Sequence, residues 1–225
     1  MMPLVSARDV SRRYEQGESD IHALETASCD IFPGEQIALM GRSGSGKSTL
    51  LHLLGGLDVP ASGTILWPLL GERDGLRPGK VAYVFQMPSL IPSLTVLENV
   101  ALPLLLQHDS VKAKQQATAT LEQLELASLA EKLPEELSGG QAQRVAVARA
   151  LAANPKLILA DEPTGQLDQT TAQHLLEVLL SSVAESGAAL VIATHDPLVA
   201  ARFPKQWSMT HGRLEREVGH VSALA

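Results

Sequence analysis

Three short apolar runs along the chain each stop at a glycine or at polar residues. The runs span 36–40, 156–160 and 189–194, and they are followed directly by Gly41, Asp161 and His195. Continuous apolar runs of this length predict strands that are buried on both faces. Because ligands in open parallel α/β sheets bind outside the carboxyl ends of the strands, the three ends are predicted to converge on one site.

Different patterns surround these runs. Residues 3–32 and 63–85 alternate apolar and polar positions, which predicts short antiparallel strands beside the main sheet. Leu90 to Leu133 contains no compact β-rich stretch, and from Val111 the apolar positions follow helical spacing. We interpret 1–225 as one α/β domain, with a core over about 1–89 and 155–225 and an inserted helical subdomain over 90–154.

Composition narrows the class of protein. Of the 225 residues, 45% are apolar and 19% are charged, which predicts a folded globular chain. The net charge of −7 argues against nucleic acid as a partner. The single cysteine, Cys29, fits a reducing compartment. No apolar run approaches the roughly 18 residues of a membrane span, and the first residues lack the apolar core of a secretory signal, so we expect a cytoplasmic location.

The first run leads into a glycine-rich loop with the pattern of a phosphate loop. Gly41-Arg-Ser-Gly-Ser-Gly-Lys-Ser48 lies at a strand-to-helix junction, as this motif requires. Its backbone N–H groups and the following helix N-terminus suit phosphate oxygens, with Lys47 at the β and γ phosphates and Ser48 at Mg²⁺. The predicted nucleotide-binding set is Gly41, Arg42, Ser43, Gly44, Ser45, Gly46, Lys47, Ser48 and Thr49.

Two adjacent acids follow the second run. An arbitrary Asp-Glu pair would be more typical of a solvated loop, but the phosphate loop upstream favours a chemical role. Asp161 is predicted to serve Mg²⁺, and Glu162 to polarise the attacking water as a general base.

A third motif, Leu137-Ser-Gly-Gly-Gln141, stands between these two, just ahead of the second run. Taken alone, the motif would more often be a simple helix cap. The exposed N–H groups at the start of a helix can also bind an anion, so the motif is a candidate second anion site. In its position it resembles the signature of the ATP-binding-cassette (ABC) ATPases. The resemblance covers essentially the whole chain, and it implies a RecA-like P-loop NTPase core with a small antiparallel β subdomain and an inserted helical signature subdomain.

In that family the signature contacts the γ-phosphate held by the phosphate loop of a second subunit. The resemblance therefore implies ATP hydrolysis with Mg²⁺ and a head-to-tail dimer, built from two copies of the chain or with a related cassette. Ser138, Gly139, Gly140, Gln141 and Asp168 would act across the interface.

Three further positions match the family. The resemblance implies that Gln86 touches Mg²⁺ and reports nucleotide state, and that His195 contacts the γ-phosphate and orients Glu162. It also implies that Tyr14 stacks on adenine. The residues alone leave other roles open, since Asp168 can cap the helix that begins near Gln169, and Tyr14 can be edge packing.

The sequence around the motifs, at 51–58, 97–103 and 160–168, resembles the lipoprotein-release, macrolide-export and cell-division group of cassettes. That implies a separate ATPase subunit, peripheral on the cytoplasmic face of the membrane, with an integral membrane permease docking near 86–103. Residues 87–95 could instead pack within the helical insert. Gln166 replaces the asparagine typical of the group. Lys47 and Gln86 stand only 39 positions apart, which predicts a trimmed antiparallel subdomain over 65–81.

Two other classes of protein fit the sequence less well. A soluble ABC ATPase of DNA repair, chromosome organisation or translation would need a long coiled coil or a second cassette, and the sequence shows neither. A small-molecule kinase or a GTPase would not explain the signature. The transported substrate and the identity of the membrane partner are not encoded in these motifs.

Overall fold

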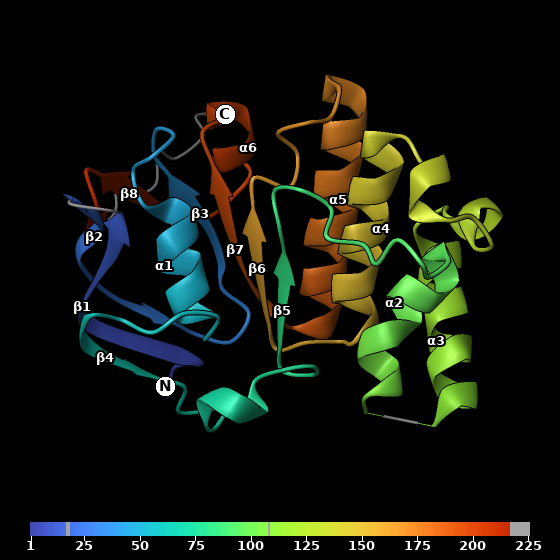
Figure 1. Ribbon diagram of the computed structural model, residues 1–225, viewed down its shortest axis with the longest axis horizontal. Helices are drawn as coiled ribbons and strands as arrows, with labels where there is room; N and C mark the ends of the chain where they lie inside the picture. Colours follow the sequence, from blue (N-terminus) through green and yellow to red (C-terminus); the bar gives the residue numbers. More distant parts are fainter. Residues whose placement is uncertain (17–18, 108, 217–225) are drawn as a thin grey trace, which may run out of the picture.

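The fold is a layered α/β arrangement around one sheet, described by a computed structural model at residues 1–16, 19–107 and 109–216 (Figure 1). Within these residues the sheet has nine strands in the order β4-β1-β2-β9-β8-β3-β7-β6-β5. The strands are β1 Val5–Gln16, β2 Ser19–Ile31, β3 Gln36–Met40, β4 Ser62–Leu66, β5 Val81–Val84, β6 Leu157–Asp161, β7 Ala189–Thr194, β8 Lys205–Thr210 and β9 Arg213–Arg216. The predicted α/β class is confirmed.

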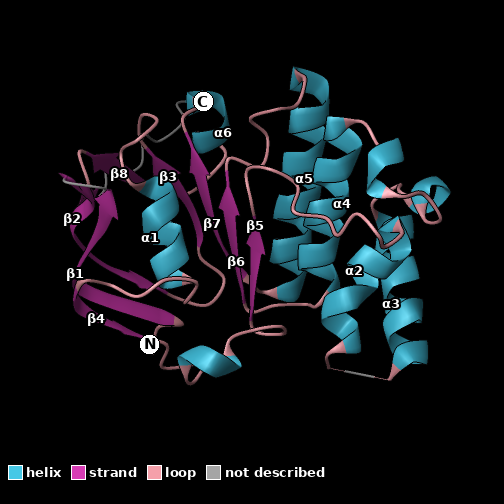
Figure 2. Cartoon of the chain, viewed as in Figure 1, coloured by secondary structure: helices cyan, strands magenta, loops and turns pink. Residues whose placement is uncertain are grey.

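Six α-helices lie within the described residues: α1 Lys47–Leu54, α2 Val96–Leu105, α3 Ser110–Gln123, α4 Gly139–Ala152, α5 Gln169–Ser186 and α6 Pro197–Ala200. Short 3₁₀ turns occur at Arg73–Gly75, Ala127–Leu129 and Pro134–Glu136. Figure 2 shows the strands gathered on one side and α2 to α4 on the other. None of the described helices has the length and apolar character to cross a membrane.

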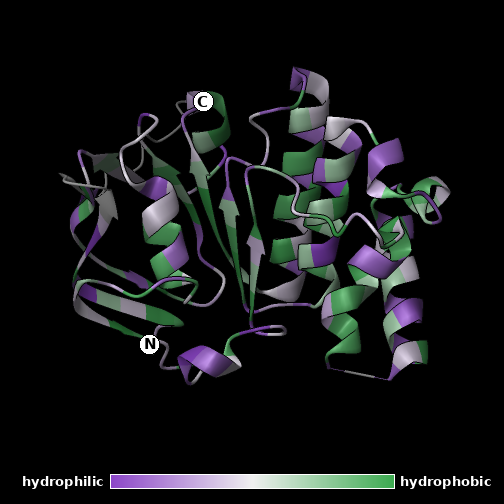
Figure 3. Cartoon of the chain, in the orientation of Figure 1, coloured by the Kyte–Doolittle hydropathy of each residue, from purple (hydrophilic) through white to green (hydrophobic). Residues whose placement is uncertain are grey.

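The three apolar runs form β3, β6 and β7, the parallel centre of the sheet. Alternate residues of β7 point to opposite faces: Val191 joins the core beneath α1, and Ile192 joins the core beneath α5. All six positions of β7 are buried, as expected of a strand covered on both sides. Figure 3 shows these central strands as strongly hydrophobic.

The expectation of antiparallel strands is correct for part of the chain and wrong for the rest. β1 pairs antiparallel with β2 and with β4, but both β1 and β2 are long rather than short. Residues 81–84, expected among the antiparallel strands, instead form β5, which pairs parallel with β6. The reason is topological, because the chain returns from β5 to β6 through helices α2 to α4, and such a crossover joins parallel strands.

The segment between β4 and β5 anchors α1 at its carboxyl end. Trp67 Nε1 donates to Leu54 O at 2.8 Å, and Arg73 Nε donates to Gly56 O at 3.0 Å. Arg77 donates to Gly55 O and Gly56 O. These donors satisfy carbonyls that a helix end leaves unpaired, and the cations complement the negative end of the helix dipole. This segment thus holds in place the helix whose other end is the glycine-rich loop.

The helices between β5 and β6 bury a core of their own. It is built by apolar residues of α2, α3 and α4, among them Val100, Leu121 and Val145. The predicted helical spacing at Ala113, Ala117, Leu121 and Leu124 is confirmed, since all four are buried. The division of the chain at residues 90 and 154 stays a prediction.

Candidate active site

The glycine-rich loop wraps around a buried lysine. The side chain of Lys47 is 5% exposed, and its Nζ donates to Gly41 O at 2.8 Å and to Arg42 O at 3.1 Å. Burying an ammonium group is costly unless it is paired, and these carbonyls compensate only part of its charge. The loop therefore presents a fixed cation inside a ring of backbone atoms, an arrangement suited to an anion.

Two details of the loop fit a phosphate group. Ser45 Oγ is buried and has no hydrogen-bond partner among the described residues, which leaves it ready for a ligand oxygen. Gly44 has a left-handed φ of 76° and open space where a side chain would stand. The first N–H groups of α1 lack partners within the helix and point into the same region.

Gly46 is required for a different reason, its close approach to β2. Its φ is 100°, and a Cβ there would lie 2.4 Å from the backbone oxygen of Ala23. We expect Gly46→Ala to lower the free energy of unfolding by about 3 kcal/mol or more, because a left-handed strain adds to a clash with backbone. Gly44→Ala, which meets open space, should cost only about 1 kcal/mol. Urea unfolding of both variants checks this, and equal losses would contradict it.

The carboxyl ends of β3, β6 and β7 meet beside this loop, as predicted. Met40 pairs with Thr194, and Asp161 pairs with Ala193. Glu162 follows at a left-handed φ of 45°, where its N–H donates to Ala193 O at 3.0 Å. This backbone bond and the turn aim the Glu162 side chain back over the ends of the strands.

The Glu162 carboxylate lies between the His195 imidazole and the Lys47 ammonium group. Its Oε2 is 3.1 Å from His195 Nδ1, and its Oε1 is 3.5 Å from Lys47 Nζ. The Glu162 side chain is 14% exposed, whereas His195 is 62% exposed and open to a ligand. Three side chains predicted from separate motifs are therefore in contact. A cavity of about 510 Å³ opens beside Glu162 and His195, which line it together with residues of the following loop, such as Gly165, and of α5 and α6.

Asp161 is more deeply buried than Glu162. Burial raises its pKa, and the neighbouring charge of Glu162 adds to this, while a hydrogen bond from Ser48 and the charges of His52 and Lys47 oppose it. Ser48 and Asp161 thus already form one oxygen cluster. A hydroxyl and a carboxylate suit Mg²⁺, which takes few protein ligands and keeps waters and substrate phosphates.

Gln86 stands exposed two residues beyond the end of β5, on the same edge of the sheet. Its neighbours are tied to α4. Gln143 Nε2 donates to Phe85 O at 3.2 Å, and Arg149 donates to Ser89 O at 2.7 Å and to Ser89 Oγ at 2.9 Å. Burial lowers the pKa of Arg149. The segment around Gln86 is therefore attached on both sides to the helix that follows the signature.

The signature begins α4. Ser138 Oγ accepts from Gln141 N at 3.2 Å, and Gln141 Oε1 accepts from Ser138 N at 2.9 Å, which forms a capping box. Gly139 is exposed, and a Cβ there would meet nothing within 4 Å. Gly140 packs near Leu167, so the signature lies beside the loop at 165–168.

The signature is separated from the glycine-rich loop of the same chain. Figure 1 shows α1 and α4 on different sides of strands β5 to β7. Asp168, the remaining residue predicted to act across an interface, caps α5: its Oδ1 accepts from Thr171 N at 3.0 Å, and its Oδ2 accepts from Thr171 Oγ1 at 2.6 Å. The capping role left open by the sequence is confirmed.

Tyr14 lies on β1 and is not part of the cluster of Lys47, Glu162 and His195. Its hydroxyl donates to Asp58 Oδ2 at 2.8 Å, and the Arg12 guanidinium lies over its ring, 4.7 Å from the centroid. Sequence reasoning missed both partners. Asp58 belongs to the stretch at 51–58 that resembles the family, and no spacing rule connects it to a residue 44 positions away.

Comparison with known proteins places the chain among close relatives. The family model described as "ABC transporter" matches residues 24–165. The Lipoprotein-releasing system ATP-binding protein LolD of Bordetella pertussis is 44% identical over 95% of this chain and 96% of its own length. LolD of Shewanella oneidensis is 41% identical over 94% of this chain and 96% of its own.

Two solved structures share the fold. The dimeric post-hydrolysis state of the ATP-binding cassette MJ0796, bound to ADP and Pi, is similar with a TM-score of 0.86 and 38% identity, covering 96% of this chain and all of that one (100%). The cbiO1 protein of Clostridium perfringens, part of the cbiONQ transporter complex, has a TM-score of 0.77 and 30% identity, covering 95% of this chain and 87% of that one.

Proposed function

The chain belongs to the ABC transporter family of ATP-binding subunits, and from this premise we propose that it hydrolyses ATP to drive a membrane complex that releases lipoproteins or related lipids. The contact of Lys47, Glu162 and His195 at the ends of three parallel strands carries the enzymatic part. The lipoprotein-release names of the relatives favour transport over a soluble ABC ATPase of DNA repair or translation.

Each residue of the cluster has a distinct task in the proposed reaction. Lys47 binds the β and γ phosphates from inside the loop, and Glu162 accepts a proton from the water that attacks the γ-phosphorus. His195 holds the Glu162 carboxylate through Nδ1 and can donate to the γ-phosphate. The low exposure of Lys47 and Glu162 strengthens these electrostatic interactions.

Ser48, Asp161 and Gln86 are the residues that would hold Mg²⁺. The contact between Ser48 and Asp161 supports this assignment, as does the position of Gln86 at the same sheet edge. When bound, the ion neutralises charge on the phosphate oxygens. Asp161 must be ionised for this, and its raised pKa means that burial opposes ionisation until a cation is present.

The site is proposed to be completed by a second subunit, in a head-to-tail dimer with two ATP molecules at the interface. Three observations support this: α4 lies away from α1, the N-terminus of α4 is exposed, and Gly139 has no neighbour among the described residues that requires a glycine. A glycine in open space is explained by the close approach of another molecule. MJ0796, the similar cassette, is itself dimeric.

The membrane partner is proposed to dock near 86–103, on the cytoplasmic face. Met87, the residue after Gln86, is 71% exposed. The loop that follows is rigid, because the fully buried Asn99 accepts from Ile91 N and donates to Ile91 O and Leu94 O. Gln143 and Arg149 join this segment to α4. A shift at Gln86 would therefore move the proposed docking surface and the signature together.

Gly139→Asp tests the role of the signature in a second subunit. A negative charge at a helix N-terminus interacts favourably with the helix dipole, and the new side chain would extend into open space. The free energy of unfolding should therefore stay equal or rise slightly. The new charge would repel a γ-phosphate arriving from the partner. We expect ATP binding to the monomer to be retained and steady-state hydrolysis to fall about 100-fold.

Phosphate release and equilibrium ATP binding are the two measurements. Ser110→Asp, which adds the same charge at the exposed first residue of another helix, α3, is the control. A Gly139→Asp protein that hydrolyses ATP at the wild-type rate would contradict the assignment.

A further inference from the structure

Arg12, Tyr14 and Asp58 form a cluster that the catalytic cycle described above does not use. Both Arg12 Nε and Tyr14 Oη donate to Asp58 Oδ2, each at 2.8 Å. The second oxygen, Oδ1, accepts from Val59 N at 2.7 Å. The Asp58 side chain is only 21% exposed, so its two oxygens are fixed by three donors with little competition from water.

The cluster connects strand β1 to the segment that follows α1. Arg12 and Tyr14 belong to β1, while Asp58 lies four residues beyond the end of α1, the helix that begins at the loop. Tyr14 pairs with Ile21 of β2, and two residues further along β2 the backbone of Ala23 abuts Gly46. Asp58 therefore fixes the Tyr14 ring relative to the same helix and loop that would hold the phosphates.

The charges of the cluster favour this arrangement. Burial alone would raise the pKa of Asp58, but the hydrogen bonds from Tyr14, Val59 and Arg12 together hold it below its usual value. Asp58 is thus a carboxylate at neutral pH and a strong acceptor. Arg12 covers one face of the Tyr14 ring, so a planar base can stack only on the other face.

We propose that Asp58 is a positioning residue for the adenine ring of ATP, holding Tyr14 at a set distance and angle from the phosphate loop. This rests on the proposed ATP binding and on the stacking of adenine on Tyr14 that the family resemblance implies. A nucleotide spans both sites, so an aromatic ring locked in place before binding spares the entropy of ordering it. Asp58 acts on the base end of the nucleotide only and leaves the chemistry at Glu162 untouched.

The test compares ATP with inorganic tripolyphosphate, which carries the phosphates but no base. For Asp58→Ala we expect ATP affinity to fall about 5- to 10-fold, with tripolyphosphate affinity unchanged. The KM for ATP should rise by the same factor, and kcat at saturating ATP should stay within about twofold. Tyr14→Phe keeps the ring and removes only the hydroxyl, so it should likewise lower the affinity for ATP and leave the affinity for tripolyphosphate unchanged. Asp58→Asn, which keeps an acceptor oxygen, should restore part of the loss.

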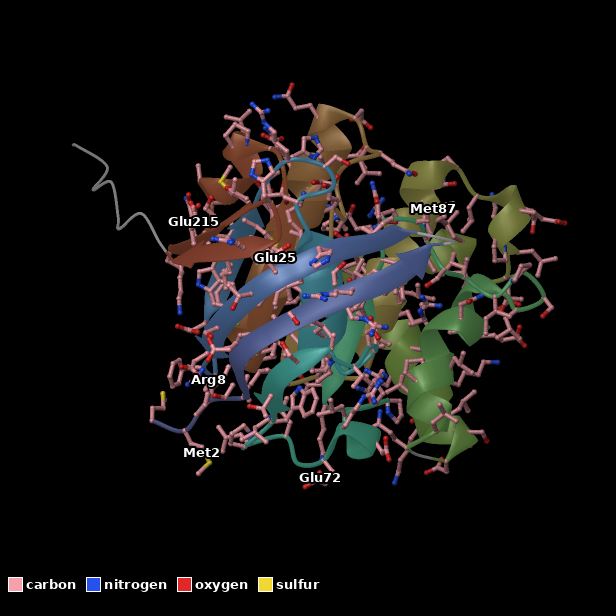
Figure 4. All side chains as sticks on the ribbon, turned by 60° about the vertical axis from the view of Figure 1, so that its left-hand side comes forward. Met2, Arg8, Glu25, Glu72, Met87 and Glu215 are labelled. Carbon is pink, nitrogen blue, oxygen red and sulfur yellow. The ribbon has the colours of Figure 1, made fainter. Side chains whose placement is uncertain are left out.

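Asp30→Ala is the matched control, because it removes the carboxylate that binds another β1 arginine, Arg8, at 2.8 Å. Figure 4 labels Arg8 on this strand pair. Equal loss of ATP and tripolyphosphate affinity in Asp58→Ala would overturn the proposal, since the damage would then lie in α1. So would an ATP affinity equal to wild type, or the same loss in Asp30→Ala. Tyr14→Ala with normal ATP affinity would instead overturn the role of Tyr14 itself.

Discussion

Glu162→Gln is expected to bind ATP and to hydrolyse it at least about 100-fold more slowly than the wild-type chain. A glutamine keeps the shape of the side chain but cannot accept the proton of the attacking water, and a general base contributes roughly 10²- to 10⁴-fold to such reactions. His195, at 3.1 Å, would have no carboxylate to orient. Single-turnover phosphate release measures the chemical step, and equilibrium titration with ATP measures binding.

Glu185→Gln is the control for this experiment, because Glu185 is an exposed residue of α5 that is bonded only weakly to Ser181, at 3.4 Å. It should hydrolyse ATP at the wild-type rate. Wild-type turnover by Glu162→Gln would remove Glu162 as the base. Loss of ATP binding in that variant would also contradict the account, since the carboxylate is assigned to the water and not to the nucleotide.

Lys47→Ala is expected to lose ATP affinity by about 100-fold or more, because each charge-assisted hydrogen bond to a phosphate is worth roughly 1.5–3 kcal/mol. The fold should survive. Lys47 is a buried cation whose desolvation cost is offset by its bonds to Gly41 O and Arg42 O and by its pairing with Glu162. Its removal also leaves the Glu162 carboxylate without that cation, so the free energy of unfolding without ATP should fall slightly.

Thermal unfolding with and without ATP separates these two effects. A ligand at 100 times its Kd stabilises a protein by about 2.7 kcal/mol, and this gain should disappear in Lys47→Ala. Lys205→Ala is the matched control, because it removes another partly buried lysine paired with a glutamate, Glu35, at 2.7 Å. An undiminished ATP-induced shift in Lys47→Ala would contradict its role.

The centre of the fold and most of the candidate active site could be predicted because their signals are local. The glycine-rich loop carries its pattern within a few residues, and the buried strands before Asp161 and His195 are continuous apolar runs. Parallel strands then bring their carboxyl ends together by topology. That is why Lys47, Glu162 and His195, spread over 149 positions, are in contact as expected.

Other features depend on contacts that no local pattern encodes. The short run at 81–84 could not be assigned to the parallel sheet by periodicity, because its pairing follows from the helical crossover behind it. The bond between Tyr14 and Asp58 joins a strand to the residues after a helix. The orphaned Ser45 Oγ becomes visible only once the loop is folded around it.

The composite site is the central claim, and the mass of Glu162→Gln in solution tests it most directly. Analytical ultracentrifugation with ATP and Mg²⁺ should give a dimer, whereas the same protein with ADP should sediment as a monomer, because ADP lacks the bridging γ-phosphate. Adding Gly139→Asp to Glu162→Gln should restore the monomer in ATP while ATP binding persists. A double variant that still dimerises with ATP would contradict a site completed by the signature of a second subunit.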